Sequence, residues 1–143
     1  MRKLFILFAV SGIFFSSCSD DDNNNPVSDC DKNIIVNEER FAQTSTDNYG
    51  IENVVLNENC LKITFGSSGC DSNSWEINLV ASEMVVETSP VQHFLKIDLF
   101  NPEDCTAFIQ KTISFDISDL QSSNENQVQL NIDGWDDNIL YSY

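Results

Sequence analysis

The sequence is poor in basic residues: its 143 residues include seven Lys and Arg against 23 Asp and Glu, a formal net charge of −16. Nucleic-acid binding is therefore excluded, because it depends on clustered Lys and Arg that neutralise phosphates. The same imbalance disfavours simple adsorption to an anionic membrane. Long apolar runs are also missing after residue 17, which excludes a protein with several membrane-spanning helices.

The residues that most often carry catalysis are scarce. His93 is the one histidine, so a histidine-based triad or acid–base pair would need it, and no Gly-x-Ser-x-Gly nucleophile elbow accompanies it. The many carboxylates have no distinguishing spacing that would mark a glycosidase pair. No Cys-x-x-Cys pair is present, so the spacing does not indicate zinc. We therefore expect no catalytic residues, no enzymatic activity, no cofactor and no bound metal.

The N-terminus has the pattern of a signal peptide. A basic pair precedes an apolar run over residues 4–15, which is of signal-peptide length and too short to span a bilayer as a mature helix. The run ends in Phe15-Ser16-Ser17-Cys18, and small residues just before a cysteine resemble a bacterial lipobox. The resemblance implies that the chain is cut before Cys18 and that this cysteine carries the lipid that anchors it to a membrane.

Acidic residues follow the lipobox cysteine directly, in the order Ser19, Asp20, Asp21 and Asp22. This start resembles the export signal of small surface lipoproteins of Bacteroidota. The resemblance implies a lipid-anchored protein of the outer membrane that is exposed at the cell surface.

The chain then divides into three parts. Residues 1–17 form the signal peptide, and residues 18–32 form the lipidated cysteine with an acidic tether rich in Asn and Asp. Residues 33–143 suit a single domain. Removing the signal peptide also removes Arg2 and Lys3, so the mature chain keeps five basic residues against 23 acidic ones. Such a charge keeps a crowded surface protein soluble and favours cations or basic partners.

Four cysteines remain once the lipobox cysteine is assigned to the lipid, an even number in an exported chain. Four cysteines allow three connectivities. If the strand expected at 75–80 runs back and the strand at 94–100 returns, Cys105 lies at the same end of the molecule as Cys70. A further strand over 83–88 would reverse this parity. The order therefore favours two disulfides, Cys70–Cys105 and Cys30–Cys60.

Apolar and polar residues alternate with period two along most of the mature chain, which is typical of β-strands. No segment keeps a 3.6-residue apolar stripe for three turns, so helix is expected to be a minor component. The pattern favours an all-β fold, a single antiparallel β-sandwich of broadly immunoglobulin-like architecture with about seven strands. The expected strands lie at 54–56, 61–65, 75–80, 94–100, 112–117, 128–133 and 139–143, with a short edge strand at 34–36.

An acidic turn near the C-terminus is the candidate ligand contact. Trp135 lies in the run Asp133-Gly134-Trp135-Asp136-Asp137 and is expected to be exposed, whereas Trp75 shares the core parity of its strand. A sugar ring can stack on an exposed Trp135. The carboxylates beside it that a ligand can also contact are those of Asp133, Asp136 and Asp137.

These observations predict a non-catalytic cell-surface protein that acts as a binding or interaction module at the outer membrane. A glycan-binding accessory protein is one alternative, and a small hydrolase or an inhibitor acting in the cell envelope is another. The expected partners are the membrane, through the lipid, and a glycan or an envelope protein. Phe94 and Phe100 lie on the otherwise polar face of their strand, where they either cap the sheet or mark a contact patch.

Replacing the lipidated cysteine tests the anchor directly. We expect Cys18→Ala to move the chain from the membrane fraction to the soluble fraction, because buried acyl chains supply about 0.8 kcal/mol of membrane affinity per methylene. Metabolic labelling with palmitate followed by fractionation measures both the lipid and the location. A Cys18→Ala protein that still carries the label or still sediments with membranes would contradict the prediction.

Overall fold

The computed structural model describes residues 29–143. The signal peptide, Cys18 and the export residues Ser19–Asp22 lie outside the described residues. Within the described part, no helix is long and apolar enough to cross a bilayer. In chain order the elements are β1 (Lys32–Asn33), β2 (Ile35–Val36), α1 (Glu38–Gln43), β3 (Gly50–Asn57), β4 (Cys60–Gly69), β5 (Glu76–Ala81), β6 (Val91–Phe100), β7 (Ala107–Asp116), the 3₁₀ helix η1 (Ser118–Leu120), β8 (Gln127–Ile132) and β9 (Ile139–Ser142).

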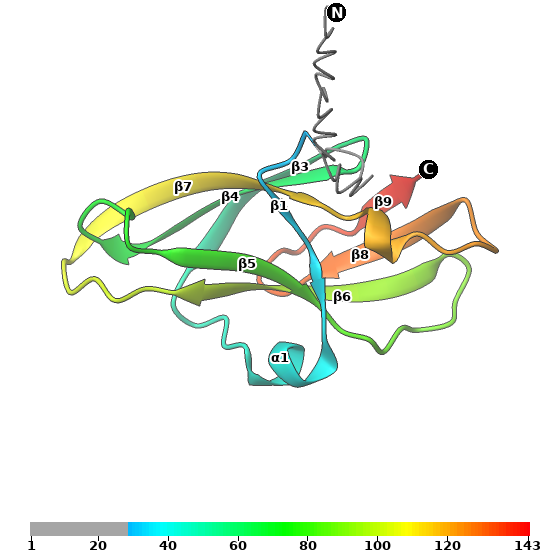
Figure 1. Cartoon of the computed structure of the whole chain (residues 1–143), viewed down its shortest axis with the longest axis horizontal. Helices are drawn as coiled ribbons and strands as arrows, with labels where there is room; N and C mark the ends of the chain where they lie inside the picture. Colours follow the sequence, from blue (N-terminus) through cyan, green and yellow to red (C-terminus); the bar gives the residue numbers. More distant parts are fainter. Residues whose placement is uncertain (1–28) are drawn as a thin grey trace, which may run out of the picture.

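The strands form two stacked sheets, with the orders β1-β7-β4-β3 and β2-β5-β6-β8-β9 (Figure 1). The all-β prediction is confirmed, but the expectation of about seven strands in a purely antiparallel arrangement is wrong. The described part has nine strands, and β1–β7, β2–β5 and β6–β8 pair in parallel. Immunoglobulin sheets are antiparallel, so this strand order differs from that architecture.

The extra strands come from the N-terminal segment, which crosses from one sheet to the other. Lys32 and Asn33 pair with β7, and two residues further on Ile35 and Val36 pair with β5. Each strand is two residues long, which is too short to show a period-two pattern in the sequence. The expected edge strand at 34–36 is therefore half of a longer crossing segment.

The inner faces of the two sheets share one core. The register places Leu61 opposite Phe115 across β4 and β7, and both side chains have no exposed surface. In the other sheet Leu79 lies opposite Ile97, and both are equally buried. The alternation that predicted these strands therefore identifies the side chains that face the core.

Two disulfides tie loops to this core, in the pairing that the expected strand order favoured. Cys30 is bonded to Cys60 at the start of β4, and Cys70 is bonded to Cys105 in the loop before β7. Beside the first bond, the Asp31 carboxylate accepts hydrogen bonds from the Ser114 backbone N–H at 2.8 Å and its hydroxyl at 2.7 Å. Residues 30–32, which close the predicted 18–32 segment, are therefore connected to the sheets.

The edges of both sheets are short or irregular. The outer strands β1 and β2 have two residues each and β9 has four. The one long edge strand, β3, changes register between Ile51 and Asn53, which marks a β-bulge. Bulges and short edges hinder the pairing of one sheet with another.

The C-terminal strand closes the core. Tyr141 is 1% exposed, and its hydroxyl donates to Asn59 Oδ1 at 2.7 Å and accepts from Gln121 Nε2 at 2.6 Å. The neighbouring residue in β9, Leu140, points to the other face and is 53% exposed. Two adjacent large side chains in one strand thus differ almost completely in burial.

This contrast allows a matched test of the core. We expect Tyr141→Ala to lower the free energy of unfolding by about 3–5 kcal/mol, because it opens a cavity in the core and removes two partly buried hydrogen bonds. Leu140→Ala, the control in the same strand, should change it by less than about 0.5 kcal/mol. Chemical denaturation of both variants measures the difference, and equal losses would show that β9 does not pack as described.

Candidate functional site

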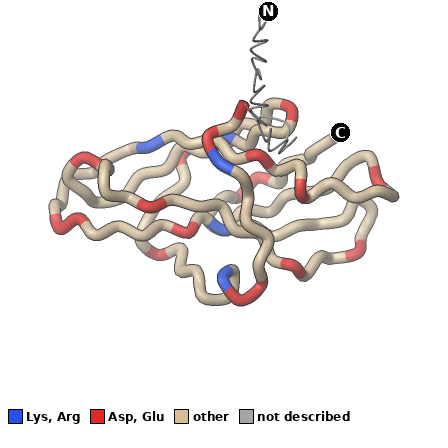
Figure 2. Tube along the Cα trace, in the orientation of Figure 1, with Lys and Arg blue, Asp and Glu red and all other residues tan. Residues whose placement is uncertain are grey.

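Acidic residues lie along the whole described chain and clearly outnumber basic ones (Figure 2). The described part contains 20 acidic residues and five basic ones, Lys32, Arg40, Lys62, Lys96 and Lys111. Four of the five are hydrogen-bonded within the chain, three of them to backbone carbonyls: Lys32 to Ile77, Lys96 to Phe41 and Lys111 to Ser72. The cations therefore stabilise the fold, and the carboxylates are left to define the surface potential.

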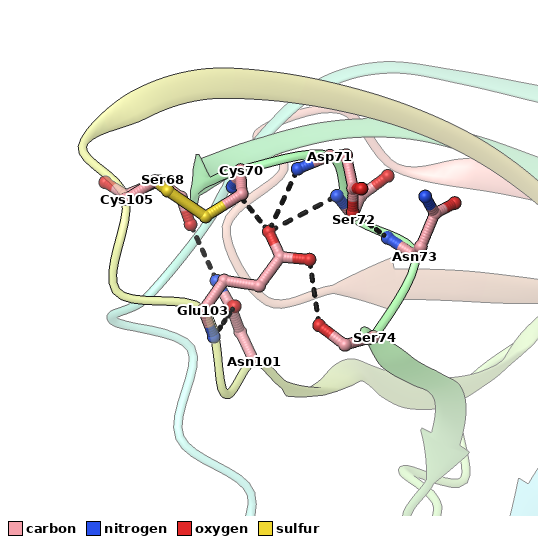
Figure 3. Close-up of a disulfide and its surroundings, with 9 residues drawn as sticks. All are labelled: Ser68, Cys70, Asp71, Ser72, Asn73, Ser74, Asn101, Glu103 and Cys105. Carbon is pink, nitrogen blue, oxygen red and sulfur yellow. Dashed lines mark hydrogen bonds between the residues drawn. A yellow bond between two sulfur atoms is a disulfide. The ribbon is translucent and has the colours of Figure 1, made fainter.

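One group of polar residues gathers around Glu103 at the end of the molecule that holds Cys70–Cys105 (Figure 3). Glu103 Oε2 accepts from the backbone N–H groups of Cys70, Asp71 and Ser72, and Oε1 accepts from the Ser74 hydroxyl at 2.8 Å. Partial burial acts to raise the pKa of Glu103. The four hydrogen bonds favour the charged form more strongly and lower the pKa to about 2.

This Glu103 cluster is a structural joint between two loops. Gly69 allows the approach, because a Cβ there would lie 2.6 Å from Glu103 Oε2 and 2.8 Å from the Trp75 ring. Asn101 adds a second connection: its side-chain oxygen accepts from the Glu103 N–H and its amide donates to the Ser68 carbonyl. The donors around the carboxylate bind the chain itself, so the cluster offers little to a ligand.

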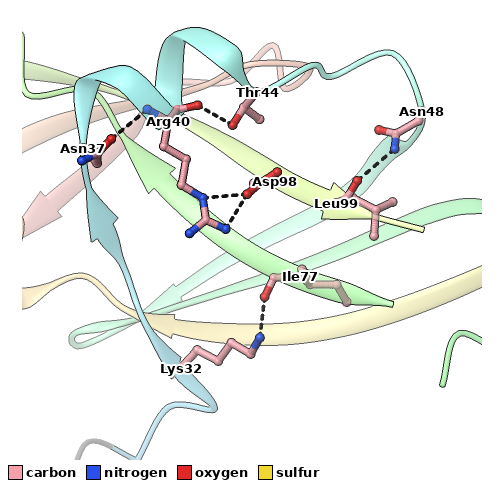
Figure 4. Close-up of polar contacts among 8 residues, drawn as sticks. All are labelled: Lys32, Asn37, Arg40, Thr44, Asn48, Ile77, Asp98 and Leu99. Atoms are coloured by element: carbon pink, nitrogen blue, oxygen red, sulfur yellow. Dashed lines mark hydrogen bonds and ion pairs between the residues drawn. The ribbon is translucent and has the colours of Figure 1, made fainter. Parts of the chain in front are cut away.

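The short helix α1 covers part of the outer face of the five-stranded sheet, where it packs on β5 and is bonded to Asp98 of β6 (Figure 4). Asn37 caps α1 by accepting from the Arg40 N–H at 2.7 Å, and the Arg40 guanidinium donates two hydrogen bonds to Asp98 Oδ2, at 2.8 and 2.6 Å. Val80 points to this outer face yet has no exposed surface, because α1 packs on β5. Six residues are too few for a helical stripe, so the sequence pattern did not reveal α1.

The rest of this outer face, formed by β6, β8 and β9, is not covered by α1, and we call it the open half-face. Its strands are in register, with Gln92 opposite Gln129, Gln129 opposite Leu140, and Phe94 opposite Asn131. A bridge between Val86 and Gln92 adds the loop before β6 to the same surface. Val86, Phe94 and Leu140 are 44%, 36% and 53% exposed, so apolar side chains surround the amides.

A pocket of about 290 Å³ lies where the open half-face meets α1. Phe94 and Phe41 provide aromatic walls, and Asn131 and Asp133 provide polar groups at the C-terminal end of β8. We call this cavity the α1–β8 pocket, and it is lined by Phe41, Phe94, Leu95, Lys96, Asn131, Ile132 and Asp133. Its size is at the lower end of the range for small-ligand sites.

The ammonium group of Lys96 is held away from the open side of the pocket. Its Nζ lies 4.5 Å from the centroid of the Phe41 ring and donates to the carbonyls of Phe41 and Thr44, both at 3.2 Å. The aromatic ring and the two carbonyl oxygens all interact favourably with the positive charge of the ammonium group. Lys96 therefore fastens α1 to β6 and shapes one wall of the pocket.

The structure separates the residues that the sequence grouped at the acidic turn. Asp133 lines the α1–β8 pocket, and its Oδ2 accepts from the Thr46 hydroxyl at 3.2 Å. The expectation that Trp135 is exposed is wrong. The side chain is half-buried and packs against the core. Within the turn, the Trp135 backbone N–H donates to the Ile132 carbonyl. Asp136 and Asp137 are exposed.

The acidic side chains of the turn are spread apart by the fold: Asp133 lines the α1–β8 pocket, and Asp136 and Asp137 are exposed. No group of three His, Cys, Asp or Glu side chains in residues 29–143 is arranged to hold a metal ion. Trp75 is 6% exposed, in agreement with the core parity of its strand, and Trp135, the ring on which the sequence suggested that a sugar stacks, packs on the core. His93 is half-buried, and desolvation lowers the pKa of its imidazole, so it carries no charge at neutral pH.

Of the two aromatic walls of the pocket, the sequence pattern indicates Phe94 and gives no sign of Phe41. Phe94 was singled out because it breaks the polar pattern on its strand, and it lines the pocket. Phe41 lies on α1, which has no sequence signature of its own. The register of β6 with β8, which brings Phe94 beside Asn131, is a parallel pairing between distant segments that a local pattern does not specify.

The Glu103 cluster gives a prediction about pH. Because the pKa of Glu103 is about 2 in the folded chain against an ordinary value of 4.5, its stabilising effect is complete above about pH 4.5 and disappears as the pH falls toward 2. We expect Glu103→Gln to lower the denaturation midpoint at neutral pH, with the difference from the wild type closing over that window. Asp104→Asn, an exposed neighbouring acid, should leave the midpoint unchanged, and a pH-independent Glu103→Gln effect would contradict the explanation.

Comparison with known proteins identifies the fold alone. No family model and no curated protein matches the chain. Two solved structures are similar, each at 17% identity over 78% of this chain: a protein of unknown function, DUF1344, from Bacteroides vulgatus, with a TM-score of 0.54, and a protein with a toxin-related name from Parabacteroides distasonis, with a TM-score of 0.50. The matches cover 56% and 59% of those chains, so this chain spans less than two-thirds of either.

Proposed function

We propose that this chain is a lipid-anchored, non-catalytic binding module displayed at the surface of the outer membrane. The lipobox ending at Cys18 supports the anchor, and the acidic start Ser19–Asp22 supports export to the outer leaflet. The strongly negative surface suits a protein that is concentrated on a membrane, since like charges keep neighbouring copies apart.

The observation that carries the binding role is the open half-face. A sheet face in a small domain is normally covered or polar, whereas this one exposes Val86, Phe94 and Leu140 around a set of amides. The α1–β8 pocket adds a concave site with a carboxylate at its edge. Shallow sites of this kind suit recognition, because catalysis by carboxylates requires a deeper and drier cleft.

A glycan-binding accessory protein is the second candidate function. The Phe94 ring offers a face on which the C–H groups of a sugar can stack, and Asn131 and Asp133 offer oxygen atoms to its hydroxyls. This candidate no longer depends on Trp135, which packs on the core. It places the sugar in the same pocket and predicts binding of uncharged oligosaccharides.

Photo-crosslinking on intact cells tests the proposed function. A photoreactive phenylalanine analogue in place of Phe94 should form an adduct with an external molecule, because this side chain lies on the open half-face. The same analogue in place of Asp119, an exposed residue of η1, is the matched control and should form none.

Two results would contradict the proposal. Equal labelling at Phe94 and Asp119 would show random contact and no binding face. Protection of the chain from protease added to intact cells would remove the surface location, and in that case deleting Asp20–Asp22 should make no difference to accessibility.

A further inference from the structure

The amide groups of the open half-face are bonded to one another in a way that uses up their donors. Gln129 Nε2 donates to Gln92 Oε1 at 3.3 Å and to Asn131 Oδ1 at 3.0 Å. Asn131 Nδ2 donates to Gln92 Oε1 and to the His93 carbonyl, both at 3.3 Å. An amide nitrogen carries two hydrogens, so both of these groups are saturated.

The remaining donors nearby are nearly used up as well. Gln92 Nε2 donates to the Thr88 hydroxyl at 3.0 Å, and that hydroxyl donates to the Pro90 carbonyl at 2.7 Å. The ammonium of Lys96 is bonded to two carbonyls and lies over the Phe41 ring. Among residues 29–143, one hydrogen of Gln92 Nε2 and one of Lys96 Nζ have no acceptor, so the surface has little capacity to donate to a ligand.

Acceptor capacity remains. Among residues 29–143, no donor bonds to Gln129 Oε1, and Asp133 receives a hydrogen bond on Oδ2 alone, which leaves Oδ1 open. Asp133 lines the α1–β8 pocket together with Lys96, and its carboxylate is the acidic group among the lining residues. A ligand for this surface must supply hydrogen-bond donors, and a positive charge is favoured over a neutral donor beside a carboxylate.

The apolar part of the surface sets a second requirement. Phe94 on β6 and Leu140 on β9 lie on either side of the amide side chains of β8. A ligand that covers these two apolar residues must bring apolar groups of its own. A second copy of this chain does not fit, because both surfaces would be acceptor-rich and negative. The ligand is thus apolar on one side and cationic on the other.

Resting on the proposed function, we infer that the open half-face and the α1–β8 pocket bind a basic amphipathic segment of another protein. An apolar side chain of that segment packs on Phe94 in the pocket, and a Lys or Arg next to it donates to Asp133 Oδ1. The negative potential of the whole molecule accelerates the encounter, and the pocket supplies the specificity.

Binding of a synthetic peptide by the full, lipidated chain in a neutral detergent tests this inference. The probe is a short labelled peptide of alternating Lys and Leu, with the corresponding Glu and Leu peptide as a comparison and protein-free micelles as the background. We expect Asp133→Asn to weaken binding of the basic peptide about tenfold, since it removes one charge-assisted hydrogen bond. Phe94→Ala should weaken it by a similar factor, and Asp119→Asn by less than about twofold.

The matched charge changes decide the result. Equal weakening by Asp133→Asn and Asp119→Asn would mean that the peptide responds to net charge alone, which overturns the inference. Binding of an uncharged oligosaccharide that Phe94→Ala abolishes, with no effect of Phe94→Ala on the peptide, would also overturn it while leaving the proposed binding function in place. If Phe94→Ala weakens the binding of neither the basic peptide nor the oligosaccharide, the result would count against both the inference and the proposed binding function.

Discussion

The bond between Arg40 and Asp98 is the ion pair among the contacts that hold α1 on the outer sheet face and so define which part of that face is covered. It holds a helix of only six residues against β6, and such a helix has little stability of its own. An ion pair with side chains 41% and 29% exposed contributes modestly by itself. It acts together with the Asn37 cap and with Lys96 on Phe41, and these contacts jointly define one wall of the pocket.

Most of the basic side chains are engaged in hydrogen bonds within the chain. Lys32 reaches the Ile77 carbonyl at 2.6 Å, Lys111 reaches the Ser72 carbonyl at 2.9 Å, and Arg40 pairs with Asp98. Lys62 lies near Asp31, whose pKa is lowered mainly by the Ser114 hydroxyl and further by that lysine. Basic side chains thus connect segments of the fold through hydrogen bonds at its surface, where they are outnumbered by 20 acidic residues in the described part.

The strand content was predictable because apolar and polar residues alternate over much of each long strand, as in Leu61–Phe65 of β4. Leu61 and Ile63, or Leu79 and Ile97, reveal their orientation in the sequence itself. The disulfide pairing followed from strand order, since Cys70 and Cys105 lie in successive loops at one end of the molecule. These predictions depend on local periodicity and on chain direction, which a single sequence contains.

The remaining features depend on contacts between distant segments. The parallel pairing of β6 with β8 and the crossing of residues 32–36 between sheets leave no local signature. Trp135 was expected to be exposed because its neighbours are acidic, but its own ring gains more by packing on the core. The pocket arises from three separate parts of the chain, so only its Phe94 wall was suggested by the sequence.

The irregular edge of the four-stranded sheet affects how copies of the chain would behave when they are crowded together. The lipid anchor proposed above would confine the molecule to two dimensions, where it would meet its neighbours far more often than in free solution, and an exposed straight strand would then recruit other copies into fibrils. The register shift between Ile51 and Asn53 interrupts the ladder of free N–H and C=O groups along β3, and no other outer strand in residues 29–143 exceeds four residues. This edge is therefore a poor template for polymerisation between copies that the proposed anchor would bring together.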